Sequence, residues 1–451
     1  MLSRFSPSLL PPETLERLFV QRSRLAETLV QGSRHSALTG NKLHHLIVGP
    51  RGSGKTHLVA LVYHRLRRDP ELEDRLLFAW LREEEWGVTS YLDFVRTVLR
   101  ALSEEGERSR LPQDKYEALG KVEDPDEALA LGERLLVETV GSRTLLILAE
   151  NLDEIFRALG RDGQQRLRAL IQNHPVFSLL GTAQSLFDGI TNRENPFYGF
   201  FATHHLEELT FESALELLLR IAEGEKSTEL ARMLATPVGR ARVRAVHHLA
   251  AGNPRIYVIF SQFLTAQSLN ELIEPLLRTL DDLTPYYQSR MALLSPQQRK
   301  IVDYLCERRG GISVTEVARA NLIAPQTVSS QLRRLDELGY VRSEQHGRMS
   351  YYELREPLLR LTLEVKKLRG QPVRLVVEFL RIWYSAQELR RLLTDPRTLD
   401  ETNYLQTALE LKRVDGDDPI SKACSAELEY SVEAGEVKRA LAAAEELYAV
   451  T

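Results

Sequence analysis

The sequence feature that most constrains this chain is the octapeptide GPRGSGKT at residues 49–56. It fits the pattern G-x-x-x-x-G-K-[ST], which is typical of loops that bind nucleotide phosphates. An apolar run at residues 43–48 precedes the loop, and the stretch that follows, HLVALVYHRL, is apolar at helical spacing. Because the pattern requires a buried strand before it and a helix after it, this context favours a nucleotide-binding α/β domain over a chance glycine-rich turn.

Each position in this loop has a chemical role. The glycines let the backbone turn tightly with its N–H groups facing inward, and the N-terminus of the following helix adds partial positive charge. Lys55 can reach the β- and γ-phosphates, and the Thr56 hydroxyl can bind Mg²⁺. We therefore expect ATP and Mg²⁺ to bind at a set of consecutive residues: Gly49, Pro50, Arg51, Gly52, Ser53, Gly54, Lys55, Thr56 and His57.

Composition narrows the class of protein further. The chain has 451 residues, of which 43% are hydrophobic and 27% charged, a balance typical of a soluble protein with several domains. Its two cysteines, Cys306 and Cys424, lie far apart, which argues against a disulfide framework or a cysteine-rich zinc site and suits a reducing cytoplasm. No apolar run approaches the roughly 20 residues of a membrane span, so we expect a cytoplasmic protein with no membrane partner.

A second, acidic motif is needed to complete a magnesium site. Residues 144–156 read TLLILAENLDEIF, in which a short apolar run is followed at once by Glu150. Ligands bind at the carboxyl ends of strands in open α/β sheets, so this cluster is predicted to lie near the phosphate-binding loop. Two further apolar runs, at residues 76–81 and 177–182, are also predicted strands. Alternation of these strands with helices predicts a parallel sheet covered on both faces.

Three segments resemble AAA+ ATPases of the origin-recognition initiator type and their bacterial relatives. They are the lead-in FVQRSRLAETLV before the loop, the acidic motif ENLDEIF and the later segment AGNPRIYVIF. The resemblance covers roughly residues 15–360 and implies an α/β P-loop AAA+ core followed by a helical lid. It assigns a polar first sensor to Thr182 and Gln184. It also implies that Arg255 reaches the γ-phosphate from the lid and that Arg193 is an interface arginine.

The acidic motif departs from the family pattern D-E-x-D and leaves two registers open. In the first, Glu150 is the metal-side acid and Asn151 stands where the family has its catalytic glutamate. In the second, shifted by one residue, Ala149 occupies the metal position and Glu150 is the base. We prefer the first, because the positions that follow then match the pattern. An amide can orient a water but cannot accept its proton, so this register predicts ATP binding with slow hydrolysis.

The segment at residues 285–360 is predicted to be a winged helix-turn-helix. Capping boxes begin at Ser295 and Ser313, and Pro325 opens a third helix. Two short strands then flank a hairpin tip at residues 346–348. The order helix, helix, helix, hairpin is that of a winged helix, and the residues resemble the MarR-like winged domain that is fused to this class of ATPase.

The third helix of this segment is predicted to enter a DNA major groove. Residues 286–370 carry 15 Lys and Arg against 9 Asp and Glu, whereas the rest of the chain has 44 against 54. This basic island within an acidic chain indicates contact with an anion. We expect duplex DNA to contact the outward side chains of the helix and the tip of the wing: Gln326, Thr327, Ser329, Ser330, Arg333, Arg334 and Arg348.

We therefore predict an AAA+ nucleotide-binding domain at residues 1–203, a helical lid at 204–284, a winged helix at 285–360 and a helical C-terminal extension at 361–451. The first hypothesis is a switch protein whose bound ATP controls its contact with duplex DNA. The second is a STAND-like signalling or defence ATPase whose winged helix and extension bind protein partners. We also expect protein partners or self-association. A winged helix that packs against protein is the alternative to one that contacts DNA.

Overall fold

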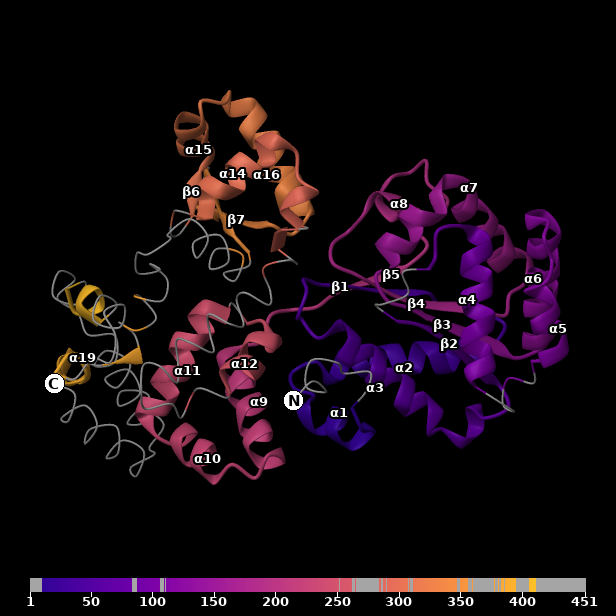
Figure 1. Cartoon of the computed structure of the whole chain (residues 1–451), viewed down its shortest axis with the longest axis horizontal. Helices are drawn as coiled ribbons and strands as arrows, with labels where there is room; N and C mark the ends of the chain where they lie inside the picture. Colours follow the sequence, from indigo (N-terminus) through magenta and orange to yellow (C-terminus); the bar gives the residue numbers. More distant parts are fainter. Residues whose placement is uncertain are drawn as a thin grey trace. The chain divides into compact units, whose positions relative to one another are not determined.

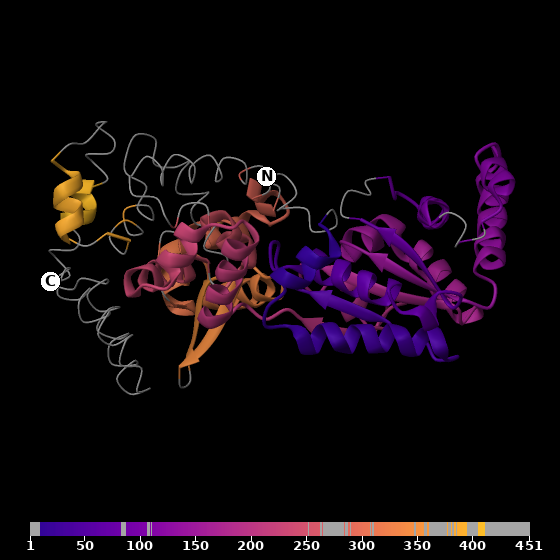
Figure 2. The same cartoon turned by 90° about the horizontal axis from the view of Figure 1, so that it is seen from below.

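A computed structural model divides the chain into two compact units, Met1–Glu207 and Glu208–Thr451, which are described separately below. Figures 1 and 2 show the elements of both units in two views. The structure describes residues 10–82, 87–105, 109, 111–250, 252–261, 264, 284, 287–288, 290–306, 308, 311–346, 349–355, 359, 377, 380, 383–384, 386–394 and 405–410.

The first unit is built on a parallel sheet whose strands follow the order β2-β3-β4-β1-β5 (Figure 1). Its strands are β1 His45–Val48, β2 Leu76–Leu81, β3 Thr144–Ala149, β4 Phe177–Ala183 and β5 Ala202–His205. The first four confirm the strands predicted from apolar runs. The fifth was not predicted, because its sequence, ATHH, is polar and largely exposed at the edge of the sheet.

Helices cover both faces of this sheet, as predicted. Along β1, Leu46 and Val48 join the apolar core on one face and Ile47 joins the core on the other. This alternation places successive side chains on opposite faces, so a sheet covered on both sides needs apolar residues at every position. One layer contains α1 Pro12–Leu18, α2 Ser23–Leu38 and α3 Lys55–Arg67; the other contains α4 Tyr91–Glu104, α6 Pro125–Val140 and α7 Leu152–Asn173 (Figures 1 and 2).

Shorter helices complete this unit. They are η3 Pro70–Leu72 before β2, α5 Gln113–Leu119 before α6, and α8 Asp188–Thr191 between β4 and β5.

The order of the strands in the sheet determines where the candidate site lies. Because β1, β3 and β4 are parallel neighbours in one sheet, the segments that follow them emerge at the same edge. That edge is where ligands bind in open α/β sheets.

The second unit begins with a group of packed helices, as expected for a lid. Each start is set by a local cap. The Thr210 hydroxyl accepts a hydrogen bond from the Ser213 N–H at 3.2 Å, and the Asn253 side chain accepts one from the Arg255 N–H at 3.1 Å. Pro254 occupies the first helical position, where the fixed φ of proline suits a helix start. The helices are α9 Phe211–Gly224, α10 Thr228–Leu234, α11 Pro237–Ala250 and α12 Pro254–Phe260.

The winged helix follows in the predicted order. The capping box at Ser295 is present. The Ser295 N–H donates to the side-chain oxygen of Gln298 at 3.0 Å, and the Gln298 N–H donates to the Ser295 hydroxyl at 3.3 Å. The strands form an antiparallel sheet in the order β6-β8-β7. The elements are α14 Pro296–Cys306, β6 Ile312–Ser313, α15 Val314–Asn321, α16 Pro325–Glu337, β7 Val341–His346 and β8 Met349–Leu354.

The predicted helical extension lies mostly outside the described residues, as do Arg348 and Cys424. Within the extension, α19 Ala386–Leu392 is described. No helix in the described ranges combines the length and apolar character needed to cross a membrane.

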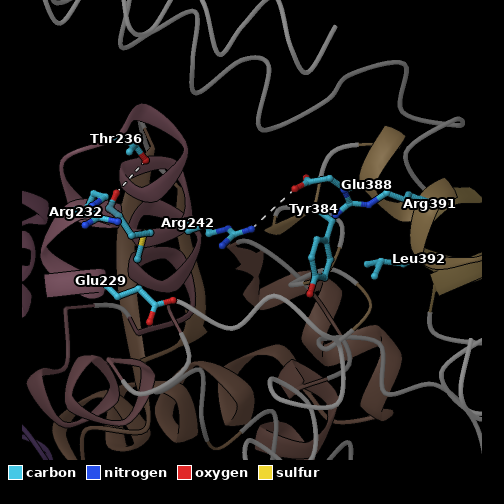
Figure 3. A pocket seen from close by; sticks show the side chains of 9 residues that line it. Glu229, Arg232, Thr236, Arg242, Tyr384, Glu388, Arg391 and Leu392 are labelled. Carbon is cyan, nitrogen blue, oxygen red and sulfur yellow. Dashed lines mark hydrogen bonds and ion pairs between the residues drawn. The ribbon is translucent and has the colours of Figure 1, made fainter. Parts of the chain in front are cut away.

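A pocket of about 350 Å³ lies between lid helices α10 and α11 and helix α19 (Figure 3). Arg242 faces Glu388 there, with 4.0 Å between their charged atoms, and its guanidinium lies 4.9 Å from the centre of the Trp383 ring. The charges that line the pocket are thus of both signs and partly paired with one another. We interpret it as a polar contact that joins the extension to the lid.

Two buried histidines of the first unit predict a pH dependence of its stability. Burial lowers the pKa of His44 and of His45 to about 4. The Leu179 N–H donates to Nδ1 of His44, and Nδ1 of His45 lies 3.1 Å from Nε2 of His204. Both groups bind protons more weakly when folded, so stability is complete above about pH 6.5 and is lost as pH falls toward 4, by at most roughly 3 kcal/mol each.

Urea unfolding at pH 7.5 and pH 5 measures this loss. His44→Asn, whose amide oxygen can accept from Leu179, is expected to reduce the difference in unfolding free energy between the two pH values. An equal pH difference in the variant and the wild type would contradict the prediction for His44.

Candidate nucleotide site

The phosphate-binding loop joins β1 to α3 through two glycines in the left-handed region of backbone space. Gly52 has φ +81° and Gly54 has φ +94°. A residue with a Cβ would be strained at either position. Gly54 caps α3, so the N–H groups of the first helical turn, beginning at Lys55, have no acceptor within the helix. Such a helix start is suited to bind an anion.

The ammonium group of Lys55 lies over this loop. It donates hydrogen bonds to the carbonyl oxygens of Gly49, at 2.7 Å, and Pro50, at 3.1 Å. The charge is therefore held at the turn that would surround a phosphate group. Gly49 itself must be small, because an added Cβ would lie 2.8 Å from the Ser53 hydroxyl and 3.1 Å from Leu206.

Glu150 connects the acidic motif to the loop. Its carboxylate accepts a hydrogen bond from the Thr56 hydroxyl through one oxygen and from the Trp80 indole, at 2.9 Å, through the other. The side chain is only 4% exposed. A hydroxyl and a carboxylate side by side are the hard oxygen ligands that Mg²⁺ takes in nucleotide sites. The residues present therefore fit a magnesium ion, which Thr56 and Glu150 could hold.

Asn151 forms the sharp turn between β3 and α7. Its φ of +52° and ψ of +49° lie in the left-handed region, which asparagine tolerates better than most residues with a side chain. Its N–H donates to the hydroxyl of Thr182, on β4, at 3.2 Å. The structure thus brings together three of the predicted site residues: Glu150, Asn151 and Thr182. Gln184 follows directly after β4 and is half-buried.

Asp153 is a site residue that sequence reasoning left without a role. It lies in the first turn of α7, and burial raises the pKa of its carboxyl group, while the charges of Arg157 and Lys55 act in the opposite direction. One carboxyl oxygen, Oδ1, is buried without a hydrogen-bond partner in the described part of the chain. A second carboxylate, half-buried and with one oxygen out of contact with solvent, therefore lies close enough to Lys55 to interact with its charge.

Arg22 is another missed residue, although it belongs to the lead-in segment. Its guanidinium donates to the carbonyl oxygens of Ser53, in the phosphate-binding loop, and Glu207, at the end of the first unit. Burial lowers its pKa to about 10, so the group stays charged at neutral pH. The sequence around Arg22 gave no signal of this role, because its partners are backbone groups distant in sequence.

Three other predicted residues have different surroundings. The ring of His57 is directed to the N-terminal helix, with Nε2 at 2.8 Å from the Leu15 carbonyl, so its backbone rather than its side chain is available to a phosphate. Arg193 is exposed in the turn after α8. Arg255 begins α12 in the second unit and is half-buried.

The predicted DNA-contacting residues other than Arg348 lie on α16. Its buried face contains Val328, Leu332 and Leu335, which leaves the polar set on the outside. Arg333 and Arg334 are exposed, and Arg334 also pairs with Glu337 at 3.1 Å. The other members of the set on this helix are exposed or half-exposed: Gln326, Thr327, Ser329 and Ser330.

Comparison with known proteins supports this architecture. The sequence model of the MarR family matches residues 294–349. Aeropyrum pernix ORC2, in ADPNP-ADP complexes, has a similar structure with a TM-score of 0.52 at 12% identity, over 77% of this chain and 94% of that chain. Its ADP form gives 0.47 at 12% identity over 78% and 98%, and A. pernix ORC1 in complex with DNA gives 0.42 at 14% over 78% and 94%. None of the curated proteins compared with the chain matches it.

These findings confirm the predicted resemblance at the level of fold. The chain has an α/β core whose fold is similar to that of A. pernix ORC2, followed by a winged helix that matches the MarR family model. At 12% identity, the likeness carries the architecture and no more.

Proposed function

We propose that this protein binds ATP with Mg²⁺ in its first unit and couples the nucleotide state to contact with duplex DNA through its winged helix. The observation that carries the proposal is the hydrogen bond between Thr56 and Glu150. It joins the end of the phosphate-binding loop to the acid that follows the central strand. Two motifs 94 residues apart in sequence thereby form one site.

Each residue of this site has a distinct role in the proposal. Lys55 and the N–H groups of residues 49–57 would hold the phosphates, and Thr56 and Glu150 would hold Mg²⁺. When bound, Mg²⁺ supplies charge neutralisation between the β- and γ-phosphates. Trp80 fixes the orientation of Glu150, and Thr182 fixes the turn that carries Asn151. In this proposal, Gln184 would act with Thr182 as a polar sensor.

The lid would report the nucleotide state to the rest of the chain. In this proposal, Arg255 reaches the γ-phosphate, and Arg193 serves a neighbouring subunit or partner protein. A nucleotide that binds one lid arrangement better than another shifts the population of arrangements. The proposed domains are the nucleotide-binding domain at 1–203, the lid at 204–284, the winged helix at 285–360 and the extension at 361–451. The ADPNP-ADP complexes of A. pernix ORC2 support nucleotide binding in such an architecture.

Contact with DNA is supported by the match to the MarR family and by the exposed polar face of α16. The alternative, a STAND-like signalling or defence ATPase, keeps the nucleotide site and gives the winged helix a protein partner. Absence of binding to random duplex DNA at low salt, with and without ATP, would favour that alternative.

Lys55→Ala tests the nucleotide site. We expect at least roughly a hundredfold loss of affinity for a fluorescent ATP analogue, because the charge-assisted hydrogen bonds to the phosphates are lost. The melting temperature without nucleotide should be measured beside affinity, because the substitution also removes the hydrogen bonds to the Gly49 and Pro50 carbonyls and the charge that acts on Asp153. Lys55→Arg is the matched control for charge alone. Wild-type affinity in Lys55→Ala would refute the assignment.

Substitutions at Glu150 and Asn151 test the proposed slow hydrolysis of ATP. With Glu150 on the metal side, Asn151→Glu should raise phosphate release, by up to about 10²–10⁴-fold if the water is already in place. The left-handed backbone at position 151 makes glutamate cost roughly 1 kcal/mol, so stability should be measured beside activity. Glu150→Gln should chiefly weaken the Mg²⁺ dependence of binding.

Other outcomes would revise this assignment. Brisk wild-type turnover that is lost in Glu150→Gln, with binding kept, would establish the shifted register. Turnover that survives Glu150→Gln but is lost in Asp153→Asn would show that the Asp153 carboxylate accepts the proton.

Arg333→Ala combined with Arg334→Ala tests the DNA contact. Each lost phosphate contact should lower the slope of log affinity against log salt by roughly 0.9 on duplex DNA. Fluorescence anisotropy across a salt series measures that slope. The control is Arg342→Ala, which removes an arginine already paired with Glu353 on the neighbouring strand. An unchanged slope in the double variant would mean that α16 does not face the DNA backbone.

A further inference from the structure

Leu322, in the turn between α15 and α16, combines a strained backbone with an exposed apolar side chain. Its φ of +55° and ψ of +44° lie in the left-handed region, where the Cβ atom crowds the following carbonyl. Its side chain is 92% exposed, more than any other described large hydrophobic side chain, and Leu293 is next at 74%. Glycine could form the same turn without either cost.

The turn explains the backbone conformation but not the choice of leucine. The N–H groups of Leu322 and Ile323 both donate to the Ala318 carbonyl, which ends α15 in the usual left-handed manner. Glycine is the common residue at such a position. Strained residues persist chiefly at binding sites and switches. A leucine kept here, with almost its entire side chain in solvent, indicates a role in binding rather than in the fold.

The surroundings of Leu322 indicate which partner it meets. The ammonium group of Lys300, an exposed residue of α14, donates to the carbonyl of the neighbouring Asn321 at 2.7 Å. Arg319 is exposed one turn earlier on α15, and Gln326 is exposed in the first turn of α16. Leu322 is thus an apolar tip near the cations Lys300 and Arg319, at the leading end of α16, which has an exposed polar face. Such a surface complements a polyanion that also has apolar groups.

We propose that Leu322 makes an apolar contact with duplex DNA at the edge of the groove that α16 enters, against thymine methyl groups or deoxyribose carbons. This inference rests on the proposed function. Apolar side chains read thymine through its methyl group, and such a contact displaces no counterions. The contact therefore adds affinity without adding to the salt dependence of binding, which separates it from the contacts of Arg333 and Arg334.

The experiment uses the full chain with Mg²⁺ and ATP, and measures anisotropy of a labelled random-sequence duplex across a salt series. Leu322→Gly should bind roughly five- to tenfold more weakly with an unchanged salt slope, because part of a leucine side chain leaves the interface. Its melting temperature should equal or exceed that of the wild type, because glycine relieves the strain. Weaker binding by a variant at least as stable as the wild type cannot come from misfolding.

Two further substitutions at the same position act as controls. Leu322→Met keeps the apolar contact and should bind nearly as tightly as the wild type. Leu322→Asn tolerates the backbone conformation but is polar, so it should bind as weakly as Leu322→Gly. A duplex with uracil in place of thymine identifies the contact: wild-type affinity falls to that of Leu322→Gly if the methyl group is contacted, and stays above it if the sugar is contacted.

The proposal is overturned if Leu322→Gly binds DNA as the wild type does while the Arg333 and Arg334 double variant lowers the salt slope. It is also overturned if Leu322→Gly changes only self-association, measured by sedimentation velocity, because the leucine would then meet a second copy of the chain. Failure of the wild type itself to bind duplex DNA would instead remove the proposed function on which the inference rests.

Discussion

The nucleotide site depends on the hydrogen bond between Thr56 and Glu150, because it joins the segments that follow β1 and β3. The parallel sheet makes this bond possible, since its strands end at one edge. A buried carboxylate needs partners, and Glu150 has the Thr56 hydroxyl and the Trp80 indole. The same contacts that make its burial tolerable also fix its orientation. If Glu150 holds Mg²⁺ as proposed, stability and function are coupled at this residue.

Sequence patterns predicted the parts of the fold that local physics determines. Apolar runs identified the four strands that are buried on both faces. Capping boxes identified the helix starts at Ser295 and Ser313, and proline identified the start at Pro325. The edge strand β5 was missed, because an edge strand is held by pairing with β1 and not by its own apolar residues. Pairing partners distant in sequence are not visible in a local pattern.

The candidate site was predictable to the same degree. The phosphate-binding loop and Glu150 stand in motifs, and the structure places them in contact. The sequence did not reveal the contacts of Arg22 or Trp80, since these come from backbone carbonyls and a neighbouring strand. Asp153 was part of the predicted acidic cluster, but its burial was not predictable. A hint for Trp80 was present, as it is a large polar-tipped residue near the end of a strand that also borders the site. If His57 binds phosphate as predicted, it does so through its backbone N–H, because its ring contacts the Leu15 carbonyl.

Asn151 and Leu322 are two backbone outliers whose conformations have different explanations. Both adopt left-handed conformations without being glycine. Asparagine is tolerated there, and the N–H of Asn151 bonds Thr182, so its conformation serves the site around it. Leucine has no such tolerance, and the exposed side chain of Leu322 returns no packing energy to the fold. When the described structure supplies no compensation for a cost, the compensation is expected from a partner. For Leu322, at the leading end of α16, the partner that fits the proposed function is duplex DNA.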